Sequence, residues 1–138
     1  MAKQNRRKRA ASRIRSIQSK LQAEDVAVKL QVFLTNFFLC EMGCKEMIVG
    51  YKYSINQPEE YKNVKLKLNI IRPAIRFYGI SVQDAVIVNV FSSRRHSAKS
   101  IRDSIVHGIS KNNLNKMLDN YDDLIRDMSV FINTIQDN

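Results

Sequence analysis

The stretch that decides the fold of this chain is Ser97–Gly108, with the sequence S-A-K-S-I-R-D-S-I-V-H-G. Its apolar residues recur every three or four positions, which predicts one buried helical stripe formed by Ala98, Ile101, Ile105 and Ile109. The polar face repeats once per turn and carries Lys99, Asp103 and His107. Arg102 lies at the border of the apolar stripe, and Gly108 predicts a helix end in the left-handed conformation.

Basic and polar residues precede this helix, in the segment Phe91–His96. Arg94, Arg95 and His96 arrive at the start of the helix, and Lys99 follows within its first turn. We interpret these four residues as RNA-binding, because cations grouped in this way can contact backbone phosphates. The alternative interpretation is an ordinary basic loop exposed to water.

Outward from this helix the chain has the pattern of an all-α protein. Glycines and prolines are few, four and two in 138 residues, and 44% of the residues are hydrophobic. Helical periodicity predicts further helices at residues 24–50, 58–78, 82–91 and 114–135. Ser81 and Asp84 predict an N-terminal cap for the third of these helices, and residues 111–113 predict a turn before the fourth. Strands are the alternative for Val64–Ile71, which alternates with period two, and for the β-branched Val86–Val90. We expect a bundle of four to five helices.

Residues 24–50 are apolar on nearly every side, which predicts burial by several neighbouring helices or by a second subunit. Phe33, Phe37 and Phe38 are therefore interpreted as core or as part of a dimer interface. Glu41 and Lys45 have the spacing of a helical ion pair on the wetter side. Gly43 predicts close approach of another helix.

The formal net charge of +10 is concentrated in two zones. Residues 1–20 hold eight Lys and Arg and no acid, which predicts a flexible basic N-terminal arm before a domain at 21–138. Residues 61–102 hold nine Lys and Arg against the single Asp84. Both zones predict binding to a polyanion such as RNA. For the arm, the alternative is a solvated tail that aids solubility.

Metal and membrane sites are not indicated. Cys40 and Cys44 lie four residues apart in an apolar segment, which predicts buried, reduced thiols. With two histidines elsewhere they do not make a four-ligand zinc site, so we expect no metal and no cofactor. No uncharged apolar run is long enough to span a membrane and no secretory signal is visible, which predicts a cytoplasmic protein without a membrane partner.

The segment Arg102–His107 (R-D-S-I-V-H), followed by Gly108, resembles the R-x4-6-H signature of the HEPN superfamily. These are small all-helical domains, and many are metal-independent ribonucleases. In the family the motif lies near the end of one helix and a long amphipathic helix follows, as Leu114–Ile135 would here. Asp103 departs from the asparagine that most often follows the arginine. The resemblance covers about residues 20–138 and implies a HEPN-like bundle.

The residue types of the motif suit RNA cleavage. His107 is a histidine, the residue type that most often acts as a general acid or base, and Arg102 can bind a phosphate through two hydrogen bonds. Asp103 lies one turn before His107 and could orient its ring. One histidine does not readily act as both acid and base. The resemblance implies a homodimer in which two motifs share one site and yield 2′,3′-cyclic phosphate and 5′-hydroxyl ends.

Three functions remain open at this point. The first is a HEPN-type endoribonuclease, of the toxin or phage-defence type, which a cognate antitoxin protein would hold silent. The second is a catalytically inert HEPN-like module that binds RNA or nucleotides or assists assembly. The third is an unrelated basic helical RNA-binding or ribosome-associated protein in which the spacing of Arg102 and His107 is accidental.

Overall fold

Every regular element of the computed structural model, which describes residues 2–137 and their side chains from residue 4, is a helix. The all-α prediction is therefore confirmed for this range. The elements are α1 (Ala2–Gln22), α2 (Val26–Ser54), the 3-10 turn η1 (Tyr61–Asn63), α3 (Leu68–Phe77), α4 (Asp84–Phe91), α5 (Ala98–His107), α6 (Lys111–Asp119) and α7 (Tyr121–Gln136). These seven α-helices exceed the predicted four to five.

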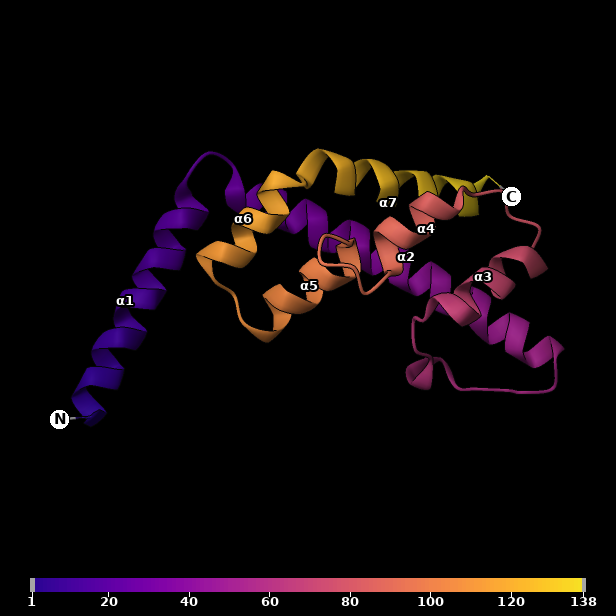
Figure 1. Ribbon diagram of the computed structural model, residues 1–138, viewed down its shortest axis with the longest axis horizontal. Coiled ribbons are helices and arrows are strands. Elements are labelled where there is room, and N and C mark those ends of the chain that lie inside the picture. Colours follow the sequence, from indigo (N-terminus) through magenta and orange to yellow (C-terminus); the bar gives the residue numbers. More distant parts are fainter. Residues whose placement is uncertain (1, 138) are drawn as a thin grey trace.

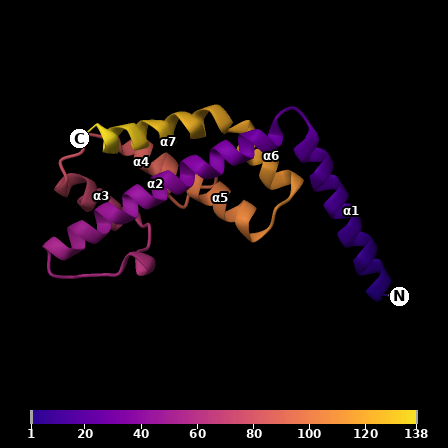
Figure 2. The same ribbon diagram turned by 180° about the vertical axis from the view of Figure 1, so that it is seen from behind.

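The long helix α2 is the spine on which the other helices pack (Figure 1). One stripe of α2 is buried, and it includes Phe33, Phe37, Cys40, Cys44 and Ile48. Helix α7 lies along it, as both ribbon views show (Figures 1 and 2). A Cβ on Gly43 would lie 3.1 Å from the Cδ1 atom of Ile135 in α7, so the predicted close approach of a helix at this glycine is confirmed.

Helix α4 closes the core between α7 and the first turns of α5. Its residues Val86–Val88, Val90 and Phe91 are buried, and the ring of Phe91 packs edge-on against Phe131 of α7 at 5.0 Å. The alternative of a strand at Val86–Val90 is therefore wrong. Ser81 does not cap this helix; Asp84 is its first residue and forms two hydrogen bonds with Arg72.

The predicted helix at 58–78 forms only in its second half, where α3 begins at Leu68 and contains Pro73. Residues 64–67 are extended and belong to no helix or strand. Val64 and Leu66 are buried while Lys65 and Lys67 are exposed, so the period-two alternation sets the direction of these side chains without pairing the backbone. Both the helix and the strand predicted for this segment are wrong.

The predicted long helix after the motif is divided in two. Ser110 caps α6, which already includes residues 111–113, and the chain turns at Asn120 before α7. The side-chain amide of Asn120 donates to the carbonyl of Lys116 over 2.8 Å. This break lets α6 pack against α5 while α7 packs against α2 and α4.

The basic N-terminal segment is helical. Helix α1 extends from the body, and it contacts α2 and α6 (Figures 1 and 2). We predicted a flexible arm over residues 1–20. Helix α1 instead begins at Ala2 and ends at Gln22, so the like-charged residues are part of a regular helix.

Helix α2 is also long and apolar enough to cross a membrane, judged by length and composition alone. An 18-residue window within Val26–Ser54 has a mean hydropathy of 1.3. Core helices have the same character; 22% of this window is buried, and α2 packs against α3, α5, α6 and α7.

Candidate functional site

Helix α5 holds the motif residues in a fixed orientation. The Ser97 hydroxyl accepts a hydrogen bond from the Ser100 amide at 3.1 Å, which caps the helix, and donates to the Ser92 carbonyl at 2.6 Å. Ala98, Ile101 and Ile105 are buried beneath the helix, whereas Ile109, which was predicted for the same stripe, lies beyond α5 and is 40% exposed. The helix predicted at residues 97–108 is therefore confirmed, and its polar residues have one defined set of directions.

The end of α5 differs from the predicted left-handed cap. Gly108 is extended, with φ −174° and ψ 93°, a conformation open to any residue. The side-chain amide of Asn113 donates to the carbonyls of Ser104 and Gly108, at 3.2 and 2.7 Å. Asn113 thus closes the last turn of α5, which carries the exposed His107.

Arg102 points toward α2. Its Nη2 atom lies 3.1 Å from Glu41 Oε2 and 3.2 Å from Asp103 Oδ1, and its side chain is 19% exposed. The guanidinium carbon lies 4.8 Å from the ring centre of Phe37. The buried Nε atom has no hydrogen-bond partner within the described residues. Arg102 is therefore already paired with protein carboxylates on one edge.

Arg102 and His107 do not form one site within a protomer. They are five positions apart in α5, which turns their side chains about 140° apart around the helix axis. Asp103 pairs with Arg102, and among residues 4–137 it forms no hydrogen bond with His107. The contacts of Asp103 within these residues therefore do not include the one expected to orient the His107 ring.

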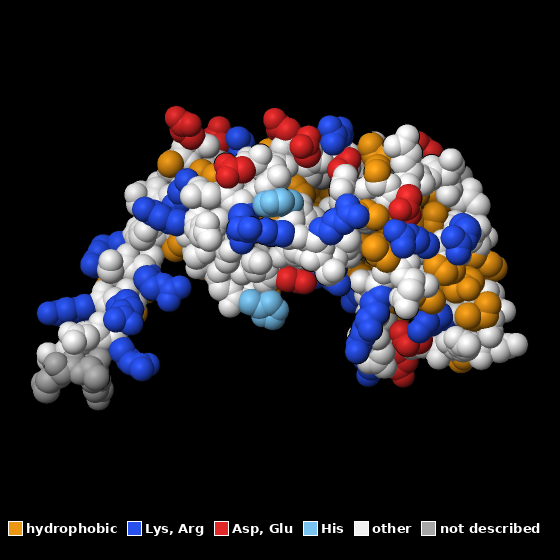
Figure 3. Space-filling model, in the orientation of Figure 1, with side chains coloured by type: hydrophobic (Ala, Val, Ile, Leu, Met, Phe, Trp, Pro, Cys, Tyr) orange, Lys and Arg blue, Asp and Glu red, His pale blue; other side chains and the backbone are white. Residues whose placement is uncertain are grey.

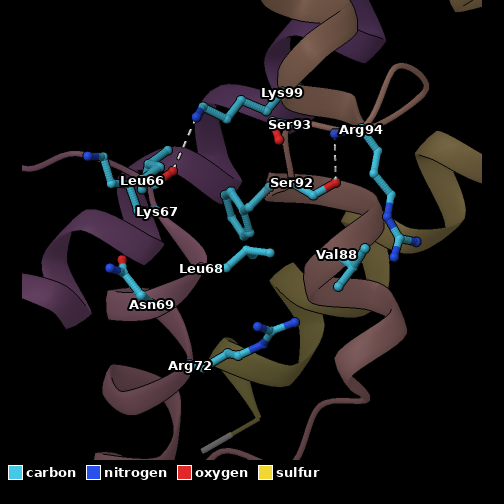
Figure 4. A pocket seen from close by; sticks show the side chains of 11 residues that line it. Leu66, Lys67, Leu68, Asn69, Arg72, Val88, Ser92, Ser93, Arg94 and Lys99 are labelled. Atoms are coloured by element: carbon cyan, nitrogen blue, oxygen red, sulfur yellow. Dashed lines mark hydrogen bonds between the residues drawn. The ribbon is translucent and has the colours of Figure 1, made fainter.

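A hollow of about 550 Å³ lies between α3, α4 and the first turn of α5 (Figure 4). Leu66, Leu68 and Val88 are among its apolar lining residues. Four cations line it as well: Lys67, Arg72, Arg94 and Lys99. Lys99 reaches across to donate to the carbonyl of Leu66 at 3.2 Å. No acidic residue belongs to this lining.

A second hollow of about 280 Å³ adjoins the first and shares Leu66, Lys67 and Lys99 with it. Its lining adds Glu41 and Arg102, so the paired guanidinium borders a hollow that shares three lining residues with the larger one. We call the two hollows together the basic groove. Its cations are Lys45, Lys65, Lys67, Arg72, Arg94, Lys99 and Arg102, against the single acid Glu41.

Only two of the four residues predicted to bind RNA line the basic groove. Arg94 and Lys99 line the larger hollow. His96 instead lines a different hollow of about 160 Å³, beside Asp123 and Asp127 on α7. Arg95 is exposed and lines neither hollow of the groove. The structure thus brings together two of the four.

Figure 3 shows how charge is divided over one face of the molecule. Lysines and arginines follow α1 and spread over the region of α3, α4 and α5, whereas acidic side chains gather along the edge formed by α6 and α7. A polyanion approaching this face would meet a positive field on both the arm and the body.

The two cysteines are buried and unpaired, as predicted. Burial raises the pKa of the Cys40 thiol to about 12 and moves the pKa of Cys44 upward as well. The Cys40 thiol donates to the Met128 carbonyl. Across residues 2–137, no group of three or more His, Cys, Asp or Glu side chains is placed to hold a metal ion.

Sequence reasoning did not predict the ion-pair partners of Arg102 or the part of the basic groove that residues 64–68 form. Glu41 was expected to pair with Lys45 along α2 but pairs across to α5. The signal for the groove was present in V-K-L-K-L at residues 64–68, where apolar and cationic residues alternate. An extended segment with this pattern buries leucines and directs lysines to one surface.

No protein-family model, curated protein or solved structure matches this chain.

Proposed function

We propose that this protein binds RNA and cleaves it as a metal-independent endoribonuclease of HEPN type, acting as a homodimer in the cytoplasm. The observation that carries the proposal is the position of His107. Its imidazole is exposed on the last turn of α5, in the helix whose Arg102 lines the basic groove. RNA held in the groove would run toward this helix.

A dimer supplies what one protomer lacks. His107 is flanked by Val106 and Ile109, which are 59% and 40% exposed. A second copy docked on this edge would cover them and bring two imidazoles to one phosphate, one as general base toward the 2′-hydroxyl and one as general acid toward the leaving oxygen.

Arg102 would then stabilise the phosphate through its Nη1 atom, since Nη2 is paired with carboxylates and Nε is buried. One edge is held by Glu41 and Asp103, which fixes the plane of the group. A guanidinium has five N–H donors, so donors remain for a phosphate oxygen once its position is set. Toxin or phage-defence activity, with a cognate antitoxin protein, is the biological setting that we propose.

One observation favours a second candidate, a catalytically inert RNA-binding module. The Arg102 guanidinium is partly buried, stacked on Phe37 and neutralised by two carboxylates, which is also the arrangement of a purely structural ion pair. In this case the basic groove and α1 bind RNA, and the exposed histidine has no chemical role.

Incubation of RNA with purified protein in EDTA distinguishes the two candidates. The ribonuclease yields 2′,3′-cyclic phosphate and 5′-hydroxyl ends, and His107→Ala lowers the cleavage rate by about 10²–10⁴-fold. His96→Ala is the matched control, since it removes the other imidazole from a hollow outside the groove. Absence of cleavage by wild-type protein, or equal cleavage by wild type and His107→Ala, would refute the ribonuclease.

A further inference from the structure

The larger hollow of the basic groove has the dimensions of a ligand site. Its volume of about 550 Å³ lies within the range of about 300–1,000 Å³ usual for small-molecule sites. It lies between Leu66–Asn69 at the start of α3 and Val88–Arg94 at the end of α4 (Figure 4). The two walls therefore come from parts of the chain about twenty residues apart, held by the core beneath.

The cations around this hollow are not equally available. Arg72 is bound by Asp84 through two hydrogen bonds, at 2.8 and 3.0 Å. Lys67, Arg94 and Lys99 form no ion pair with an acidic side chain within residues 4–137. The ammonium of Lys99 donates to a neutral carbonyl, which leaves its charge uncompensated. Three positive charges therefore remain for an anion at the rim.

The floor and edges suit a nucleobase. Leu68 and Val88 offer an aliphatic surface to the flat face of a base, and the amide of Asn69 is both donor and acceptor for its edge. Bases in a duplex are stacked inside the helix, whereas those of a single strand can enter a side pocket while the backbone follows cations outside. The combination of apolar floor and cationic rim thus fits one nucleotide of a single strand.

We infer that this hollow binds one nucleotide of single-stranded RNA, with the base over Leu68 and Val88 and the phosphate between Lys99 and Arg94. The inference rests on the proposal that RNA is the ligand of this protein. It adds the strand form of the RNA and a base-binding pocket separate from His107, which lies two turns further along α5.

The test is a binding titration of a fluorescent single-stranded ten-nucleotide RNA, and of the same sequence as a duplex, with full-length protein. All proteins carry His107→Ala so that the RNA stays intact. Arg94→Gln with Lys99→Gln removes two charges from the hollow, and Arg76→Gln with Lys111→Gln removes two exposed charges elsewhere. Ser93→Glu places a carboxylate in the hollow, and Ser81→Glu is its exposed control.

We expect the protein whose hollow is unchanged to bind the single-stranded RNA more tightly than the duplex. The double variant Arg94→Gln/Lys99→Gln should raise Kd for the single strand about tenfold or more. Loss of two phosphate contacts should also lower the magnitude of the slope of log K against log salt concentration by about 1.4. Ser93→Glu should weaken single-strand binding likewise, and both controls should change Kd less than about threefold.

Equal weakening by the hollow variants and their controls would overturn the inference, since binding would then depend on net charge alone. Equal affinity for single strand and duplex would also overturn it. These outcomes are independent of cleavage. A wild-type protein that binds as expected but leaves RNA intact refutes the ribonuclease and keeps the nucleotide pocket, whereas a cleaving protein with unaffected hollow variants does the reverse.

Discussion

Glu41 of α2 accepts a hydrogen bond from the Arg102 guanidinium of α5 over 3.1 Å, with both side chains at most one quarter exposed. This contact joins the spine of the fold to the helix that carries the proposed catalytic residues. Arg102 therefore has a structural role even if it takes no part in catalysis, because the Arg102 guanidinium also covers the ring of Phe37.

Arg102→Ala should therefore destabilise the fold. Removal of one member of a partly buried pair leaves Glu41 without its cation, which costs about 2 kcal/mol of unfolding free energy. Lys62→Ala breaks the exposed pair with Glu60 and should change stability by less than about 0.5 kcal/mol. Denaturant titration of both variants measures the difference, and similar midpoints would contradict a structural role for Arg102.

The helix that carries Arg102 shows where sequence reasoning succeeds. The helix at residues 97–108 was predictable because its apolar residues recur every three or four positions, and the structure buries Ala98, Ile101 and Ile105 of that stripe. The same periodicity buries Phe33 and Phe37 while Phe38 is 48% exposed, since adjacent residues point 100° apart. Local pattern sets the face that each side chain occupies.

Partners across the fold could not be predicted in the same way. Glu41 and Arg102 are 61 residues apart, and a favourable neighbour of Glu41, Lys45, lay one turn away. The sequence also gives no measure of how the extended segment at 64–67 settles against α5. That placement makes the groove, through the bond from Lys99 to the Leu66 carbonyl.

The proposed dimer places Val106 in an interface. Val106→Glu puts a charge on that apolar edge and should shift the protein toward monomers, with loss of cleavage and little change in protomer stability because this side chain is exposed. Sedimentation and RNA cleavage measure the two effects. Val130→Glu, on α7 and 41% exposed, is the matched control. A Val106→Glu dimer that cleaves normally would exclude this interface.

The buried thiols should resist modification in the folded protein. Burial raises the pKa of Cys40 to about 12 from an unfolded value of 9.0, so the folded state holds its proton where the unfolded state loses it. The stability linked to this thiol is full below pH 9 and is lost as the pH rises toward 12. Iodoacetamide at pH 8 should label Cys40 and Cys44 only after denaturant is added. Rapid labelling without denaturant would contradict the burial.

Asn113 connects the stability of the α5 end to the position of His107. Its amide satisfies the carbonyls of Ser104 and Gly108, so Asn113→Ala leaves both without this partner. The expected cost is about 1 kcal/mol of unfolding free energy, the usual loss for a capping side chain. If His107 acts in cleavage, its last helical turn must be held in place, and the cleavage rate should fall by a larger factor than RNA affinity. Asn112→Ala, at the exposed neighbouring position, should change neither quantity. Equal losses in cleavage and affinity, or an effect as large in Asn112→Ala, would indicate that this turn does not position the imidazole.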